Sequence, residues 1–72
     1  MTAETLDCRG QRCPLPVIAL ARRLGELPIG TELTVLADDP AAANDIPAWC
    51  RLTGHILVFE KHPVYLIRRK ES

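Results

Sequence analysis

The stretch Cys13-Pro14-Leu15-Pro16 stands before an apolar segment that carries arginines and continues to Leu27. Proline is tolerated in the first turn of a helix, because amide groups there have no acceptor within the helix. The sequence therefore predicts a helix from Pro14 to about Leu27, with Cys13 as its N-cap. Apolar side chains at helical spacing are expected to form its buried stripe: Val17, Leu20, Ala21, Leu24 and Leu27.

The predicted position of Cys13 favours an ionised thiol. A helix N-terminus carries partial positive charge and stabilises an anion, and a thiolate is such an anion. Pro14 and Pro16 lack N–H groups and are expected to shape a rigid seat for the sulfur, which leaves the Leu15 amide as the nearest free donor. We therefore expect an exposed Cys13 with a lowered pKa, although less lowered than at a donor-rich helix start.

Further charged and sulfur-bearing residues are candidates for accessory roles at this site. Arg9 and Arg12 precede Cys13 and are expected to add positive potential if their loop folds back, and to steer a partner. Cys8 is either a small core residue or a resolving thiol for Cys13, and Cys50 is expected to pack in the core. Three aspartates are expected to border the same edge of the sheet or to cap helices: Asp38, Asp39 and Asp45.

The rest of the chain predicts four strands and a second helix. Short runs rich in apolar and β-branched residues predict the strands: Thr5–Cys8, Glu32–Ala37, His55–Glu60 and Val64–Arg69. Asp39 as N-cap and Pro40 at the first helical position open the second helix, and Gly54 ends it. Pro47 is expected to kink or divide this helix, because it removes a backbone donor. The link Lys61-His62-Pro63 predicts a hairpin between the last two strands.

The order β-α-β-α-β-β predicts one domain over residues 1–72. Two helices on one face of a four-stranded mixed sheet would give a two-layer α/β sandwich, an α+β arrangement. A right-handed crossover makes the first two strands parallel, and the hairpin makes the last two antiparallel. The other face would remain open, yet residues 56–59 and 64–67 are apolar instead of alternating cleanly. Either this face contacts a partner or a second copy, or these residues are scattered surface hydrophobes.

Composition restricts the classes of function. Nine basic and nine acidic residues cancel, so direct binding of nucleic acid is disfavoured. The first residues lack the basic start and apolar run of a signal peptide, and no apolar run approaches the roughly 18 residues of a membrane span. Three cysteines cannot form a closed disulfide set. We therefore expect free thiols, a cytoplasmic location and no membrane association.

The cysteines and histidines match no metal site and no catalytic pair. Cys8 and Cys13 form a C-x4-C pair, at the long end of the C-x2-4-C spacing of zinc sites, but His55 and His62 lie far along the chain and no second pair of ligands accompanies the cysteines. Neither His55 nor His62 has a sequence context that places it beside Cys13 as a base. No metal and no cofactor are therefore expected. Without a metal or a base, the remaining reactions are those that a thiol carries out by itself. These are thiol exchange and the carriage of an extra sulfur atom as a persulfide.

Four segments together resemble the signature of the TusA family of sulfur carriers, also called SirA-like proteins, whose mark is C-P-x-P. They are Leu6-Asp7-Cys8-Arg9-Gly10-Gln11-Arg12-Cys13-Pro14-Leu15-Pro16, Ala37-Asp38-Asp39-Pro40, Asp45-Ile46-Pro47-Ala48-Trp49-Cys50 and Tyr65-Leu66-Ile67-Arg68. The resemblance implies a fold similar to the C-terminal domain of bacterial translation initiation factor three. It also implies a sulfurtransferase-type carrier in which Cys13 bears the persulfide.

The resemblance further implies a sulfur relay. A cysteine desulfurase or a rhodanese would supply the sulfur, and a downstream acceptor, DsrE-like or other, would receive it. The relay would serve tRNA thiolation, sulfur oxidation or cofactor biosynthesis. Two other functions stay open: an interaction module that binds a protein or RNA through the open sheet face, and a thiol–disulfide oxidoreductase that uses Cys8 and Cys13.

Overall fold

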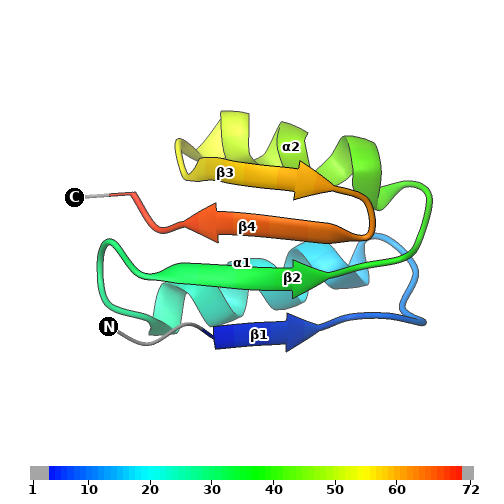
Figure 1. Cartoon of the computed structure of the whole chain (residues 1–72), viewed down its shortest axis with the longest axis horizontal. Helices are drawn as coiled ribbons and strands as arrows, with labels where there is room; N and C mark the ends of the chain where they lie inside the picture. The colour runs from blue at the N-terminus through cyan, green and yellow to red at the C-terminus, as the bar shows by residue number, and fades with distance from the viewer. Residues whose placement is uncertain (1–3, 71–72) are drawn as a thin grey trace.

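The computed structural model describes residues 4–70 and has the predicted order of elements (Figure 1). In chain order they are β1 (Glu4–Asp7), α1 (Leu15–Glu26), β2 (Glu32–Leu36), α2 (Ala42–Thr53), β3 (Ile56–Lys61) and β4 (Val64–Arg68). The bounds differ from the predicted ones by a residue or so at most ends. The second helix differs more, since it begins after the Asp-Asp-Pro segment and not at Pro40.

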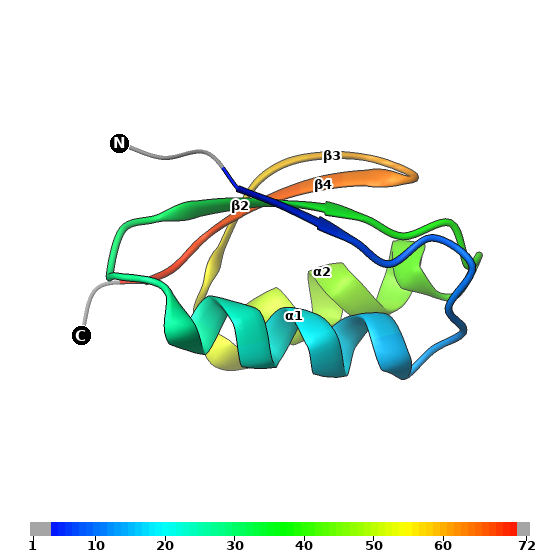
Figure 2. The same ribbon diagram turned by 90° about the horizontal axis from the view of Figure 1, so that it is seen from below.

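The four strands form one mixed sheet in the order β1-β2-β4-β3. β1 and β2 are parallel, whereas β4 is antiparallel to both β2 and β3. Both helices lie on the same face of this sheet, which leaves its other face uncovered (Figure 2). The predicted two-layer fold is therefore confirmed, including the parallel first pair and the final hairpin.

The core lies between the sheet and the two helices. Alternate residues of β2 and β4 point toward the helices, and each helix contributes one apolar stripe. The buried apolar residues are Cys8, Leu20, Leu24, Leu27, Leu33, Val35, Ala37, Ala42, Ile46, Cys50, Tyr65 and Ile67. The predicted stripe of α1 is correct at Leu20, Leu24 and Leu27, whereas Val17 is half-buried and Ala21 is exposed. Ala21 lies outside the stripe because the buried positions of α1 are four residues apart, at 16, 20 and 24.

Helix α2 departs from the sequence prediction at its start and its middle. Ala41, not Asp39, is its N-cap, and the helix continues through Pro47 without division. The proline removes only one backbone donor, and Ile46 and Cys50 pack into the core on either side of it. Gly54 ends the helix in the left-handed region with φ 88°, as predicted from its C-cap role.

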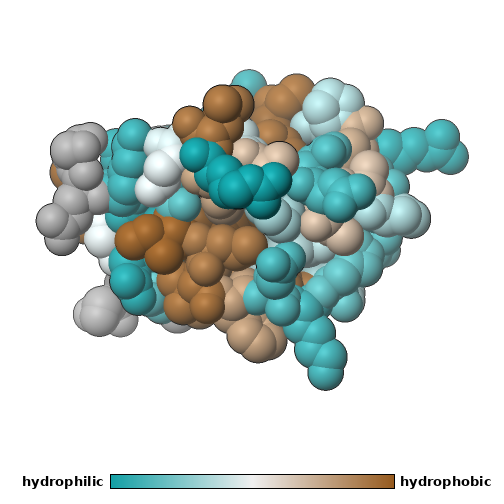
Figure 3. Space-filling view, turned by 90° about the horizontal axis from the view of Figure 1, so that it is seen from above, coloured by the Kyte–Doolittle hydropathy of each residue, from teal (hydrophilic) through white to brown (hydrophobic). Residues whose placement is uncertain are grey.

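The uncovered face of the sheet is partly apolar near β3. Leu66 lies between buried Tyr65 and Ile67 and therefore points away from the helices, and Phe59 is its partner across the β3–β4 pair. Phe59 is 51% exposed, and Ile56 and Val58 on the same edge strand are also exposed. Figure 3 looks onto the edge of the molecule where β3 lies and shows apolar side chains gathered there.

One edge of the molecule collects several of its loops. The carboxyl ends of β1 and β2, the starts of both helices and the turn between β3 and β4 all lie on the right of Figure 1. A right-handed crossover brings strand ends and helix starts together in this way. Within residues 4–70, no helix is both long enough and apolar enough to cross a membrane.

Candidate functional site

Cys13 lies in the connection between β1 and α1, two residues before the helix begins. The Leu15 amide donates to the Arg12 carbonyl at 2.9 Å, which makes Cys13 and Pro14 the central residues of a tight turn. Pro14 is therefore the N-cap of α1, and the prediction that Cys13 holds this place is wrong by one residue. The thiol-bearing residue is half-buried at the loop-rich edge.

The pKa of Cys13 is shifted in the direction opposite to the prediction. Burial raises it first, then a hydrogen bond to the carboxylate of Asp45, and then the charges of Asp45 and Asp39, to about 11. The prolines on either side of Leu15 supply no N–H groups to a thiolate. At neutral pH the resting thiol is therefore protonated, because burial and the nearby carboxylates together outweigh the positive end of α1.

The predicted positive potential from the loop before Cys13 does not reach the sulfur. Arg9 pairs with Asp7 at the end of β1, at 2.8 Å from Nη2 to Oδ2 and 2.9 Å from Nε to Oδ1. This pairing lowers the pKa of Asp7 to about 2. Arg12 is exposed, and neither arginine is among the groups that shift the pKa of Cys13. The charges that act on the thiol are acidic.

The three aspartates meet at this edge, as predicted. The backbone N–H of Cys13 donates to Asp39 Oδ2 at 2.7 Å, and that of Gly10 donates to Asp38 Oδ1 at 2.9 Å. Asp45, in the first turn of α2, is one of the groups that raise the pKa of the Cys13 thiol. Two loops distant in sequence are thus joined through carboxylates at the cysteine.

Comparison with known proteins agrees with this architecture. Residues 4–68 match the family model described as Sulfurtransferase TusA. The chain belongs to the TusA family. Two proteins of Neisseria meningitidis, from serogroups A and B and each named "Putative sulfur carrier protein", are 47% identical to it over 58 residues. This match covers 81% of the present chain and 78% of each relative.

A solved structure supports the same assignment. The crystal structure of the SirA-like protein from Desulfitobacterium hafniense has a TM-score of 0.71 to this chain and is 29% identical to it. The match covers 94% of this chain and 99% of that chain. The resemblance to TusA and SirA-like proteins drawn from the C-P-x-P segment is therefore confirmed across nearly the whole fold.

The two prolines that follow Cys13, at positions 14 and 16, have different surroundings. Pro14 is exposed and forms the N-cap of α1, whereas Pro16 is buried in the first turn of the helix. Burial of the Pro16 ring fixes the first turn of α1 against the core, and Pro14 fixes the backbone directly after Cys13. A role of both prolines in shaping a rigid seat for the sulfur stays a prediction.

The other two cysteines of this TusA-family chain are core residues. Cys8 is 1% exposed and its amide donates to the Leu36 carbonyl at 2.7 Å, while Cys50 is 3% exposed on α2. Burial raises the pKa of both thiols, that of Cys50 to about 11. The core interpretation of both residues is thus supported, and a buried thiol at Cys8 is poorly suited to resolve a bond at Cys13.

Sequence reasoning missed one pair near the site. His62, in the β3–β4 turn, is hydrogen-bonded through Nδ1 to the hydroxyl of buried Tyr65, with the rings edge-to-face at 5.9 Å. Burial first, then the charge of Glu60 and that of Cys13 once ionised, raise the pKa of Tyr65. The one sequence signal for this pair was the predicted hairpin, because its turn places His62 at the same edge of the sheet as the carboxyl ends of β1 and β2. Across residues 4–70, no group of three or more His, Cys, Asp or Glu side chains could hold a metal ion.

Proposed function

We propose that this chain is a sulfur carrier that holds a transferable sulfur atom as a persulfide on Cys13. The observation that carries the proposal is the contrast among its three cysteines: Cys8 and Cys50 are buried, whereas Cys13 reaches the surface within the family motif. Membership of the TusA family and the names of the Neisseria relatives support the same role. A carrier needs an accessible sulfur and surfaces for its partners, and a 72-residue chain can supply both.

The transfer step needs only the sulfur atoms of two proteins. The Cys13 thiolate attacks the outer sulfur of a donor persulfide, R–S–SH, and a new S–S bond forms while the S–S bond of the donor breaks. The products are Cys13–S–SH and the donor thiolate, so no external oxidant or reductant is consumed. Delivery to an acceptor repeats the exchange, with the acceptor thiolate as the attacking group.

The acidic surroundings of Cys13 give the resting carrier a protonated thiol. A protonated thiol is a poor nucleophile, which protects it from alkylation and oxidation between transfers. The thiol must lose its proton before it attacks, and both burial and Asp45 oppose this loss. We propose that the donor surface promotes this loss when it docks at the edge where Cys13 lies.

We propose a class of protein for each partner in the relay. A cysteine desulfurase or a rhodanese supplies the sulfur, and a DsrE-like or other acceptor protein receives it for tRNA thiolation, sulfur oxidation or cofactor biosynthesis. Leu15 and Ile18, which are exposed on the first turns of α1 beside Cys13, offer an apolar contact for such partners. Three free thiols suit the reducing cytoplasm, where we propose that the carrier works.

The direct test is the intact mass of the protein after incubation with a cysteine desulfurase and L-cysteine. The wild-type chain is expected to gain one sulfur atom that a reductant removes. Cys13→Ser is expected to lose this gain, whereas Cys8→Ser and Cys50→Ser keep it. Retention of the added sulfur by the Cys13→Ser protein would overturn the assignment.

A binding module is the second candidate, and one observation favours it. The exposed side chains of Ile56, Val58 and Phe59 lie on an edge strand, a surface that often binds other chains. RNA binding that weakens with salt at micromolar protein would support this function. The third possibility, a Cys8–Cys13 dithiol, is disfavoured by the burial of Cys8, and redox titration would test it.

A further inference from the structure

The connection from β1 to α1 is held by few bonds of its own. Within it, the Gln11 amide donates to the Cys8 carbonyl at 3.2 Å and the Leu15 amide donates to the Arg12 carbonyl at 2.9 Å. Pro14 has no amide to donate, and α1 has no side-chain cap. The position of Cys13 therefore depends on contacts with another part of the chain.

Asp39 supplies that contact. Its Oδ2 accepts the Cys13 N–H at 2.7 Å in a partly buried setting, across 26 residues of sequence. Asp38, its neighbour, accepts the Gly10 N–H at 2.9 Å. Hydrogen bonds to a carboxylate are shorter and stronger than those between neutral groups. The loop between β2 and α2 thus holds the sulfur-bearing loop at two points.

The charge of Asp39 acts against the reaction. It raises the pKa of Cys13 and so reduces the fraction of reactive thiolate. If only the ionisation of Cys13 mattered, removing the Asp39 carboxylate would therefore speed the reaction. Any favourable contribution of Asp39 to sulfur transfer must come from geometry, that is, from where it holds the backbone of Cys13.

We propose that Asp39 is a positioning residue for sulfur transfer, which fixes the backbone of Cys13 by accepting its N–H and so presents the sulfur in one place to a partner protein. This inference rests on the proposed function of Cys13. Attack on a persulfide needs the two sulfurs aligned, and misplacement by about 1 Å is enough to slow such a step by roughly a hundredfold.

Three substitutions separate geometry from charge. Asp39→Asn keeps an acceptor oxygen and removes the charge, Asp39→Glu keeps the charge and displaces the acceptor, and Asp39→Ala removes both. Glu26→Gln, at the far end of α1, is the matched control for loss of a carboxylate. Far-UV circular dichroism verifies that each variant is folded before its rates are measured.

The rates to compare are sulfur uptake from a cysteine desulfurase and from glutathione persulfide. With the protein donor, Asp39→Ala and Asp39→Glu are expected to be at least about tenfold slower than wild type, whereas Asp39→Asn is expected to stay within about threefold. Glutathione persulfide is small and can approach Cys13 from many directions. The rates of sulfur uptake from it should therefore differ much less among the variants. Alkylation by iodoacetamide at fixed pH should be faster in both uncharged variants, because both lower the pKa of Cys13.

Amide exchange gives a readout that is independent of sulfur transfer. Exchange of the Cys13 N–H, followed by NMR on the whole chain, should be faster in Asp39→Ala and Asp39→Glu than in wild type or Asp39→Asn. Equal transfer rates in wild type and Asp39→Ala would overturn the positioning role, and so would a loss in Asp39→Asn as large as that in Asp39→Ala. Absence of sulfur uptake by the wild-type Cys13 from either donor would instead overturn the proposed function.

Discussion

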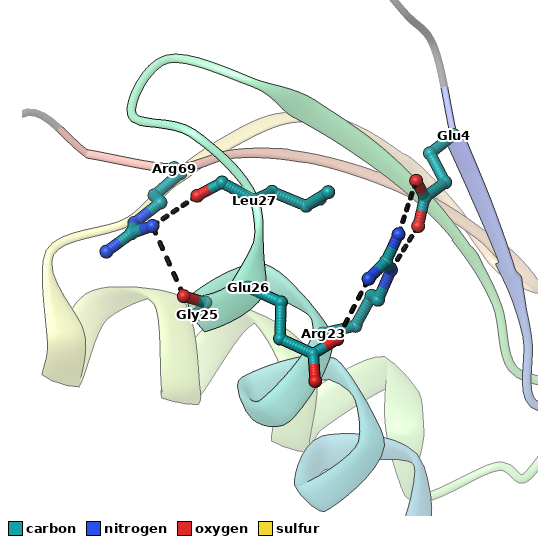
Figure 4. A network of polar contacts seen from close by, with 6 residues as sticks. All are labelled: Glu4, Arg23, Gly25, Glu26, Leu27 and Arg69. Carbon is teal, nitrogen blue, oxygen red and sulfur yellow. Dashed lines mark hydrogen bonds and ion pairs between the residues drawn. The ribbon is translucent and has the colours of Figure 1, made fainter.

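The guanidinium of Arg69, just beyond β4, donates to the carbonyl oxygen of Leu27 at the end of α1 (Figure 4). The same Nη1 lies 3.4 Å from the carbonyl oxygen of Gly25. The last carbonyls of a helix have no partner within the helix and carry partial negative charge, so a cation there is stabilising. This contact links residues 42 apart in sequence and joins the sheet to α1 at the end opposite Cys13.

Arg69→Ala is expected to lower the free energy of unfolding by about 1–2 kcal/mol, because it leaves these carbonyls without their cationic partner. Urea denaturation followed by far-UV circular dichroism measures this change. Arg22→Ala, an exposed position on the same helix, is the control and should stay within about 0.5 kcal/mol of wild type. Equal losses in the two variants would contradict the role of Arg69 in capping α1.

Acid should weaken the fold through the carboxylates of β1. Hydrogen bonds from Arg23 lower the pKa of Glu4, and those from Arg9 lower the pKa of Asp7 to about 2 (Figure 4 shows the Glu4 pair). A folded-state pKa below the unfolded one means that the native state favours the ionised form. The stabilisation is therefore present above the ordinary pKa of about 4 and is lost as the pH falls toward 2.

The measurement for this acid effect is stability by urea denaturation at pH values from 6 to 2. Asp7→Asn should flatten the part of the profile between about pH 4 and pH 2. Both Asp7 and Arg9 are well exposed, so the difference should be small and should shrink in high salt. An unchanged profile in the Asp7→Asn variant at low salt would contradict the assignment.

Sequence patterns predicted those features that depend on near neighbours along the chain. The strand predicted over residues 32–37 and the C-cap role of Gly54 depend on local sequence and backbone sterics, and both are confirmed. The prediction of a lowered Cys13 pKa is wrong, because folding buries the thiol and brings the carboxylates of Asp45 and Asp39 near it. The sequence correctly predicted that Asp39 and Asp45 lie at the same edge as Cys13. Their effect on the sulfur depends on the folded structure, which brings them close to it.

Asp45→Asn should make the Cys13 thiol more acidic. Asp45 raises the pKa of Cys13 both by accepting its hydrogen bond and by its charge, and the amide lacks that charge. The rate of iodoacetamide alkylation against pH should have its midpoint at about 11 in wild type and at a lower pH in the variant. Peptide mapping by mass spectrometry assigns the modified residue to Cys13.

Asp7→Asn is the control for the Asp45 experiment, since Asp7 lies at the same edge but bonds to Arg9. Its alkylation midpoint should equal that of wild type. A midpoint that does not move in Asp45→Asn would show that burial and Asp39, and not Asp45, set the pKa of Cys13.

His55, which directly precedes β3, should make its contacts with Lys70 and Trp49 sensitive to mild acid. Its Nδ1 accepts the Lys70 N–H at 3.1 Å, and its ring stacks on Trp49 with centroids 5.1 Å apart. Only an unprotonated Nδ1 can accept that bond, and burial together with the charges of Lys70 and Arg69 lowers the pKa of His55 below 6.5. A lowered histidine pKa means that the native state favours the neutral form. The stabilisation is therefore present above about pH 6.5 and is lost as the pH falls through the folded-state pKa.

NMR titration of the His55 ring protons should give a midpoint below 6.5 in the folded chain, and Trp49 fluorescence should change over the same range. His55→Gln keeps a side chain that can accept a hydrogen bond but does not titrate near neutral pH, so it should remove the fluorescence transition. His62→Gln is the matched control, since His62 lies in the β3–β4 turn and contacts Tyr65, whereas His55 is the histidine that stacks on Trp49. A fluorescence transition that persists in His55→Gln but disappears in His62→Gln would assign the acid sensitivity to the turn near Cys13 instead.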